Sequence, residues 1–393
     1  MKKILLIPVL ILLGLCINQS AYSLPRFSLM TGAKCGYCHT NPTGGQLRND
    51  NGVTYSVETL PLAAHKEDDF LFNPKLTDNI RIGGDFRTQF LYDMAMNSND
   101  NDTVKGKTAF HAMTASVYAS INLSKKISFY FKQDILNIKY DWYNGPEIFG
   151  VAKILPQGGY IKAGVFMPEY GWRLDDHTTY TRGGDIGSNP PLGLIFLPDY
   201  KDIGLEVGAN VDAFSLTASI LSGTGNRSRL TFSRDKAYTA KVEYNGTIGD
   251  EGSNYKLGVS GYWFKSYSMG GFHAGFSHGD FVLFGEMDWT HQQISDPLLT
   301  SFGGTPNVSA AFVELDYRAL QGLWITAKYD AFDPLDGVVD DELTPATNTV
   351  KKLIFGLEFF PYSFVELRPQ YRHLIEKPSQ ENDQFLLQLH LWF

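Results

Sequence analysis

DQFLLQLHLWF, residues 383–393 at the end of the given chain, alternates between apolar and polar positions. In an extended strand, side chains two residues apart share one face. One face of this segment would therefore be apolar, with Phe385, Leu387, Leu389, Leu391 and Phe393. The opposite face would carry Gln384, Gln388 and His390. This period of two predicts a strand with an apolar side and a polar side.

The same alternation recurs upstream. The segments NIRIGGDFRTQF (79–90), AAFVELDYRAL (310–320) and FVELRPQYRHLI (364–375) place apolar residues on one face and charged residues on the other. Turn residues separate these segments from one another. The pattern predicts sixteen strands, at residues 80–94, 107–123, 126–139, 147–155, 159–167, 201–211, 214–222, 236–246, 254–267, 271–277, 281–293, 308–318, 323–332, 350–360, 364–375 and 383–393.

Two folds could produce such strands: a soluble sandwich with a wet outer face, or an outer-membrane barrel with lipid outside and a polar lumen. The connections favour the barrel. Tight turns are predicted at 124–126, 156–159, 278–280, 319–322 and 361–363, and long loops at 95–106, 168–200, 223–235, 294–307 and 333–349. Outer-membrane barrels have short periplasmic turns, longer external loops and an even number of strands. We therefore predict an all-β fold, a transmembrane antiparallel barrel over residues 79–393.

Composition narrows the function further. The chain has 393 residues, including 38 glycines, and 14% of it is aromatic, as expected of strands and turns. Residues 1–23 combine Lys2 and Lys3 with an apolar run and the ending AYS, which predicts a signal peptide for export. Its removal would take the net charge from −8 to −10 and leave no basic tract, which argues against nucleic-acid binding. No later stretch is long and apolar enough for a membrane-spanning helix.

Residues 24–78 do not alternate, and they contain the motif KCGYCHTNPTGG (34–45). Cys35, Cys38 and His39 have the spacing of a c-type haem attachment site, in which both thiols bond to the porphyrin and the histidine is the proximal iron ligand. A zinc site would need a second ligand pair, and a redox CxxC pair normally begins a helix in a βαβ unit. Cys16 would leave with the signal peptide. We predict that residues 24–78 form a plug with one covalent haem c.

The second axial ligand of the iron is less clearly marked. His65 lies in the same segment and is the first candidate for the distal position. Ligation by two His or Met side chains favours electron transfer over chemistry at the iron. The alternatives are a five-coordinate iron, or a distal ligand supplied by the barrel wall.

The longest connection begins with FMPEYGWRLDDHTTYTRGGD (166–185) and carries side chains suited to a divalent donor metal: Glu169, Asp175, Asp176, His177 and Asp185. Oxygen and imidazole groups of this kind bind first-row metals. The other interpretation is a solvated porin loop, which in porins often folds inward and narrows the pore.

A single CxxCH on a short exported segment, followed by about sixteen strands and a C-terminal Phe393, resembles the fused outer-membrane cytochrome-porin family of iron-oxidising bacteria. Only Cys35, Cys38 and His39 match residue by residue. The resemblance implies transfer of electrons from extracellular Fe(II) to a periplasmic cytochrome or other carrier, an iron:cytochrome c oxidoreductase type of activity. The sequence HTNPTGGQLRNDNG (39–52) departs from the Phe-Pro and Gly-Arg sequence of established iron oxidisers.

Two other functions stay open at this point. One is a passive porin in which the haem is structural or sensory. The other is a haem enzyme that acts on peroxide or nitrogen oxides, which would need an open iron site.

Overall fold

The computed structural model describes residues 25–45, 47–65, 73–94, 106–135, 146–174, 176, 178–182, 184, 200–223, 234–249, 252–291, 307–334, 340, 348–379 and 382–393. The predicted signal peptide, residues 1–23, lies outside these ranges. The strands are β1 (Ile80–Asp93), β2 (Lys107–Asn122), β3 (Ile127–Asp134), β4 (Glu147–Ala152), β5 (Tyr160–Phe166), β6 (Asp202–Val211), β7 (Phe214–Leu221), β8 (Ala237–Ile248), β9 (Ser253–Phe264), β10 (Tyr267–His278), β11 (Phe281–His291), β12 (Asn307–Leu320), β13 (Leu323–Asp333), β14 (Val350–Phe359), β15 (Val365–Ile375) and β16 (Gln384–Trp392).

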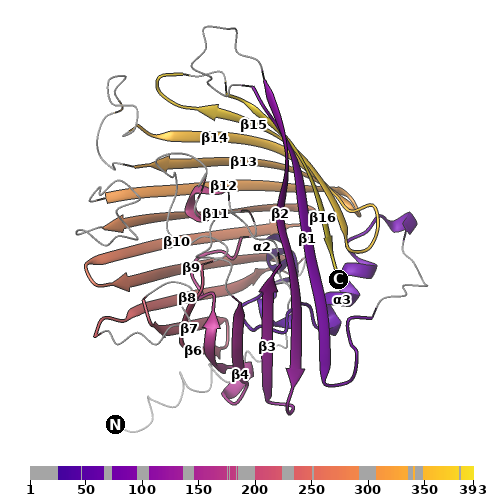
Figure 1. The fold of residues 1–393 in the computed structure, drawn as a ribbon, viewed down its shortest axis with the longest axis vertical. Coiled ribbons are helices and arrows are strands. Elements are labelled where there is room, and N and C mark those ends of the chain that lie inside the picture. Colours follow the sequence, from indigo (N-terminus) through magenta and orange to yellow (C-terminus); the bar gives the residue numbers. More distant parts are fainter. Residues whose placement is uncertain are drawn as a thin grey trace.

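These strands form a closed antiparallel barrel in which each strand pairs with its neighbours in sequence (Figure 1). The barrel closes between β1 and β16, where Phe86 lies opposite Leu391 and Phe90 lies opposite Leu387. Closure leaves no free sheet edge, so every strand finds two partners for its backbone groups. The predicted all-β barrel is confirmed, and the sixteen described strands follow the predicted order.

Some predicted boundaries are wrong: predicted strand 126–139 ends at Asp134, predicted strand 147–155 ends at Ala152, and predicted strand 271–277 begins at Tyr267. The sequence placed a break at 268–270, between strands 254–267 and 271–277. The structure turns earlier, at Lys265, which has a positive φ of 53°. Gly270 pairs with Gly261 inside the sheet, and the indole Nε1 of Trp289 lies 3.3 Å from where a Gly270 Cβ would be. A large neighbouring side chain covers the glycine and keeps it in the strand.

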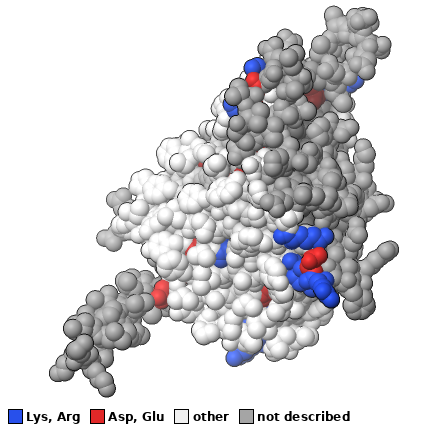
Figure 2. Space-filling model, turned by 90° about the vertical axis from the view of Figure 1, so that its left-hand side faces the viewer, with Lys and Arg blue, Asp and Glu red and all other residues white. Residues whose placement is uncertain are grey.

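The two faces of the barrel wall differ as the alternation predicts. Outward side chains such as Met287, Val313 and Phe355 are apolar and 51%, 51% and 55% exposed. Figure 2 shows a largely uncharged surface over the wall, with one cluster of charged side chains at its right and the others scattered singly. Inward positions are charged and buried, and they pair across strands, as Lys352 does with Asp330 at 3.3 Å. This wall is built for contact with lipid on the outside and polar groups within.

The N-terminal segment, residues 25–65, contains α2 (Pro25–Thr31), η1 (Cys35–Tyr37), α3 (Asp50–Glu58) and η2 (Ala63–His65). It lies inside the barrel at the short-turn rim, the end where tight turns such as 279–280 and 321–322 join the strands. The backbone oxygen of Leu29 accepts a hydrogen bond from the Ser277 hydroxyl at 2.8 Å, and the Leu62 amide donates to the Phe360 oxygen at 3.0 Å. None of the helices described here is long and apolar enough to cross a bilayer.

A second element enters the lumen after β5. Residues 167–174, 176 and 178–182, here called the inner loop, lie against inward-facing side chains of distant strands. The amide of Gly171 donates to the Ser260 hydroxyl at 2.9 Å, and the amide of Trp172 donates to the Glu286 carboxylate at 2.7 Å. The Arg182 guanidinium binds the same Glu286 at 2.6 Å. Charged wall residues therefore hold the inner loop in place.

Candidate functional site

The cysteine motif is folded as one short helical turn. In η1, the amides of Cys38 and His39 both donate to the Cys35 carbonyl, each at 3.2 Å. This turn gathers the two thiols and the imidazole within five residues, which is the local geometry that the CxxCH spacing requires. Both cysteines are free of disulfides, Cys35 being half-buried and Cys38 buried. His39 is buried as well, at 8% exposure.

Asn49, the residue before α3, holds the cysteine motif through hydrogen bonds to its backbone. Its side-chain oxygen accepts a hydrogen bond from the Gly52 amide at 3.2 Å and so caps the N-terminus of α3. Its side-chain nitrogen donates to the Tyr37 carbonyl at 2.6 Å, and its backbone amide donates to the Cys38 carbonyl at 2.9 Å. A Cβ at position 52 would overlap that carbonyl of Cys38, so glycine is required there. One asparagine thus joins the haem motif to the following helix.

Gly44 and Gly45 let the inner loop approach the motif. Their φ angles are +85° and +109°, a backbone conformation that favours glycine. A Cβ on Gly44 would lie 3.2 Å from the Cys35 Cβ and 3.4 Å from Cδ of Arg173, and one on Gly45 would lie 3.0 Å from Nη2 of Arg173. Arg173 also donates from Nη1 to the Thr43 carbonyl at 3.4 Å. The glycine pair therefore makes room for an arginine from the inner loop.

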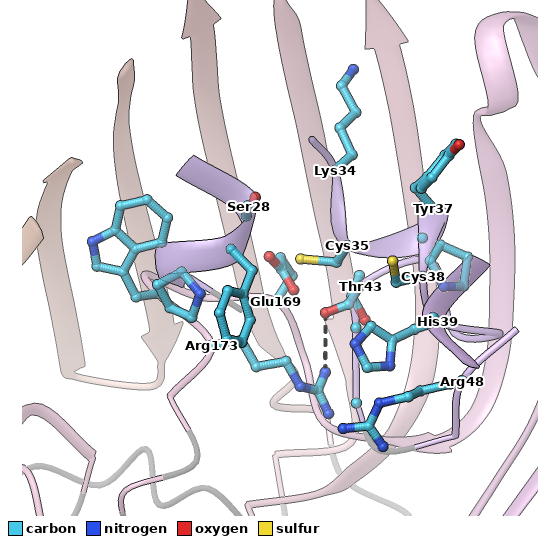
Figure 3. A pocket seen from close by; sticks show the side chains of 18 of the residues that line it. Ser28, Lys34, Cys35, Tyr37, Cys38, His39, Thr43, Arg48, Glu169 and Arg173 are labelled. Carbon is cyan, nitrogen blue, oxygen red and sulfur yellow. Dashed lines mark hydrogen bonds between the residues drawn. The ribbon is translucent and has the colours of Figure 1, made fainter. Parts of the chain in front are cut away.

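A cavity of about 550 Å³ lies between the N-terminal segment, the inner loop and the barrel wall. Its volume falls within the range of small-molecule and cofactor sites. Cys35, Cys38 and His39 all line it, and Figure 3 shows them together with Glu169, Arg173 and Arg48. Its Phe, Tyr and Trp lining consists of Phe27, Tyr37, Tyr55, Tyr160, Trp172, Phe360 and Trp392. The structure thus brings the three motif residues to one cavity within the barrel.

Charged side chains surround the motif. Lys241 lies between Glu169 and Glu243, at 2.8 and 3.3 Å, and also donates to the Gly171 carbonyl. Burial raises the pKa of the Cys35 thiol, and the Glu169 carboxylate raises it further, so this thiol is protonated at neutral pH. Burial lowers the pKa of Arg48 to about 10, which leaves its guanidinium charged at neutral pH. Arg48 is half-buried and lines the cavity.

His65 is placed apart from this cavity and does not contribute to its lining. His65, in η2, packs against the turn between β14 and β15, where its Nδ1 lies 2.8 Å from the Pro361 carbonyl oxygen. Its ring stacks on that of Tyr362, with the centroids 4.7 Å apart. The structure therefore does not bring His65 together with His39. Two methionines, Met113 and Met167, do line the cavity.

Of the five predicted metal-binding residues, the structure describes two. Glu169 is bound to Lys241, as described above. Asp176 accepts a hydrogen bond from the Thr178 hydroxyl at 2.6 Å and lies 3.4 Å from Nζ of Lys328. Asp175, His177 and Asp185 lie outside the described residues. Within the part of the chain that the structure describes, no group of three or more His, Cys, Asp or Glu side chains could hold a metal ion.

Sequence reasoning missed Asn49, Trp172 and Arg173. Asn49 carries a local signal, since an asparagine before a helical run is a common N-cap. Trp172 and Arg173 carry none, because their partners at Gly285 and Thr43 are more than a hundred residues away in the chain.

The comparisons with known proteins concern the fold. The sequence matches no protein-family model and no curated protein. Among solved structures, the outer membrane channel DcaP of Acinetobacter baumannii is 15% identical with a TM-score of 0.51, and the match covers 82% of this chain and 99% of that one. OmpTdeltaL8, a loop-deletion mutant of an outer membrane protein of Vibrio cholerae, is 12% identical over 80% and 99% of the two chains, with a TM-score of 0.51. OmpF of Salmonella typhi is 13% identical over 80% and 98%, also with a TM-score of 0.51. The chain therefore has a porin-like barrel.

Proposed function

We propose that this protein is an outer-membrane barrel that carries one covalent haem c in its lumen and passes electrons between an extracellular donor and a periplasmic carrier. The observation that carries the proposal is the convergence of Cys35, Cys38 and His39 on one cavity inside the barrel. When bound, haem c supplies one-electron redox chemistry. Fe(II) is the donor that the resemblance to cytochrome-porins suggests, and the periplasmic partner would be a cytochrome.

The residues present suit a covalent haem. Cys35 and Cys38 would bond to the porphyrin, and His39, on the same helical turn, would be the proximal ligand. The aromatic lining offers apolar contact to a flat macrocycle, and the surrounding protein limits contact with water. For the distal position, a ligand from elsewhere in the barrel interior is favoured over His65, because Met113 and Met167 line the cavity.

The position of the cavity supports electron transfer through the barrel. The N-terminal segment lies at the short-turn rim, and in outer-membrane barrels short turns face the periplasm. The apolar belt of such barrels is about 25 Å tall. A redox group held inside it could be approached from both ends of the lumen. The barrel would keep the group within reach of a donor that does not cross the membrane.

The test is to reconstitute the protein in liposomes, trap oxidised cytochrome c inside, and add Fe(II) outside as a chelate that does not enter through the protein. We expect reduction of the trapped cytochrome with the wild-type protein and none with Cys35→Ala/Cys38→Ala, which should also lose haem staining on denaturing gels. Release of a trapped small sugar, measured in parallel, tests the passive-porin alternative. Sugar release without cytochrome reduction, or equal reduction by both proteins, would overturn the proposal.

A further inference from the structure

We propose that Arg48 and Arg173 bind the carboxylate groups of the haem, and that the inner loop is thereby part of the haem site. This inference rests on the proposed haem attachment at Cys35 and Cys38. Haem carries two propionate carboxylates, and guanidinium groups form charge-assisted, often bidentate, hydrogen bonds with carboxylates.

Arg173 reaches the motif from a distant part of the chain. It packs against Gly44 and Gly45, next to Cys35, and its polar contact there is with the Thr43 carbonyl at 3.4 Å. Several other cations that line the cavity are bound to carboxylates, such as Lys241 to Glu169 and Glu243, and Arg368 to Glu358 and Glu366. Lys34, which also lines it, is bound to the Asn210 side-chain oxygen at 2.8 Å. Within the described residues, Arg173 forms no ion pair. Its guanidinium faces the cavity and can form an ion pair with an anionic ligand there.

Arg48 reaches the same region from within the N-terminal segment. Arg48 and His39 form an antiparallel backbone bridge. Arg48 therefore lies directly opposite the predicted proximal ligand. Its guanidinium lies over the ring of Trp392, 5.1 Å from the centroid. Figure 3 shows the guanidinium groups of Arg48 and Arg173 both directed to the end of the cavity beyond the His39 ring. Two cations at one end of the cavity match the two carboxylates on one edge of the porphyrin.

The inner loop holds Arg173 in position before any ligand binds. Next to it, the Trp172 indole donates to the Gly285 carbonyl at 2.9 Å, and the Trp172 carbonyl accepts from Nη2 of Arg182 at 2.8 Å. These contacts attach the base of the Arg173 side chain to β11. A preorganised cation loses less entropy on binding than a mobile one. The inner loop therefore already holds Arg173 where the proposed haem carboxylate would bind.

The experiment compares resonance Raman spectra and reduction potentials of the purified full-length protein with those of Arg48→Gln and Arg173→Gln. The control is Arg318→Gln, which removes an arginine of β12 that binds Asp280 and does not line the cavity. We expect the propionate bending bands to shift in the two cavity variants and to stay unchanged in the control. The reduction potential should fall in both, because loss of a nearby positive charge disfavours the added electron. A tenfold change in the ratio of oxidised to reduced haem corresponds to about 59 mV.

Further measurements separate the other outcomes. Haem staining first verifies covalent attachment in each variant, so loss of the proposed cofactor is distinguished from loss of its carboxylate contacts. If Arg173→Gln lowers attachment, Arg173→Lys keeps the charge and should recover the potential, although not the bidentate contact. Bands that do not move in either cavity variant would refute the assignment. The two arginines would instead bind a free carboxylate ligand if two results were obtained together. The propionate bands would be the same in the cavity variants and the wild type, and succinate would change the reduction potential of the wild-type protein.

Discussion

The barrel wall and the N-terminal segment show two different ways in which a sequence specifies structure. Each strand of the wall pairs with two neighbours through backbone hydrogen bonds, and its alternation decides which side chains face outward. The N-terminal segment has only short helices and one turn of η1, and it depends on glycines at close approaches and on partners in the wall. The difference teaches that the wall is specified by local periodicity, whereas the segment takes its shape from the lumen around it.

Buried polar contacts connect the two regions. Arg26, in α2, forms ion pairs with Asp316 and Glu358 of the wall. The Lys256 ammonium donates to the Ala33 carbonyl at 2.6 Å, two residues before Cys35. These contacts span more than two hundred residues of sequence.

The largest effect is expected from Lys162→Met. The Lys162 ammonium lies 2.6 Å from Glu206, with both side chains fully buried, and it also donates to the Thr43 hydroxyl at 3.1 Å. Its removal leaves a buried carboxylate without its cation, which typically costs about 3–5 kcal/mol. Urea unfolding in detergent measures the loss. Lys351→Met, on the outer face of β14, is the matched control and should change the unfolding free energy little; equal losses would contradict the role of the buried pair.

A smaller effect tests the two faces of the wall. Leu387 points outward near the middle of β16 and is 43% exposed, while its neighbour Gln388 points inward and is 8% exposed. Leu387→Lys should lower barrel stability in lipid by about 2–4 kcal/mol, because a charge would face hydrocarbon. Gln388→Lys should be tolerated, because its ammonium enters a polar lumen. Assembly into lipid vesicles, followed by the heat-dependent gel shift, reports both. Similar assembly of the two variants would mean that the strand faces are assigned wrongly.

The smallest effect concerns the N-terminal segment alone. Asn49→Ala removes the cap of α3 and the bond to the Tyr37 carbonyl, and loss of such a cap costs about 0.5–2 kcal/mol. Hydrogen exchange of the α3 amides should quicken roughly 2- to 30-fold, while exchange in β10 and β11 stays the same. Thr54→Ala, at an exposed position of the same helix, is the control. Faster exchange throughout the barrel would show that the segment and the wall unfold together.

Much of the wall could be predicted from the sequence. The alternation in residues 383–393 assigned Leu387 and Leu391 to the outer face and His390 to the inner face, and the structure confirms both, with exposures of 43%, 37% and 5%. The strand boundary near Gly270 could not be predicted from the sequence. Trp289 covers this glycine in the sheet, and no residue next to Gly270 in the chain distinguishes a covered glycine from one in a turn. Likewise, Cys35, Cys38 and His39 were visible as a motif, while Arg173 had no local signal.

The sequence by itself determined the strand order, the two faces of the wall and the grouping of two thiols with one imidazole. Each of these depends on residues within a few positions of one another, where backbone geometry fixes which side chains meet. Only the tertiary structure decided that the motif faces a cavity inside the barrel, that His65 does not line it, and that Arg173 packs next to Cys35. Closure of the barrel brings β5, β11 and the N-terminal segment together, and no local pattern encodes distances that depend on closure of the whole sheet.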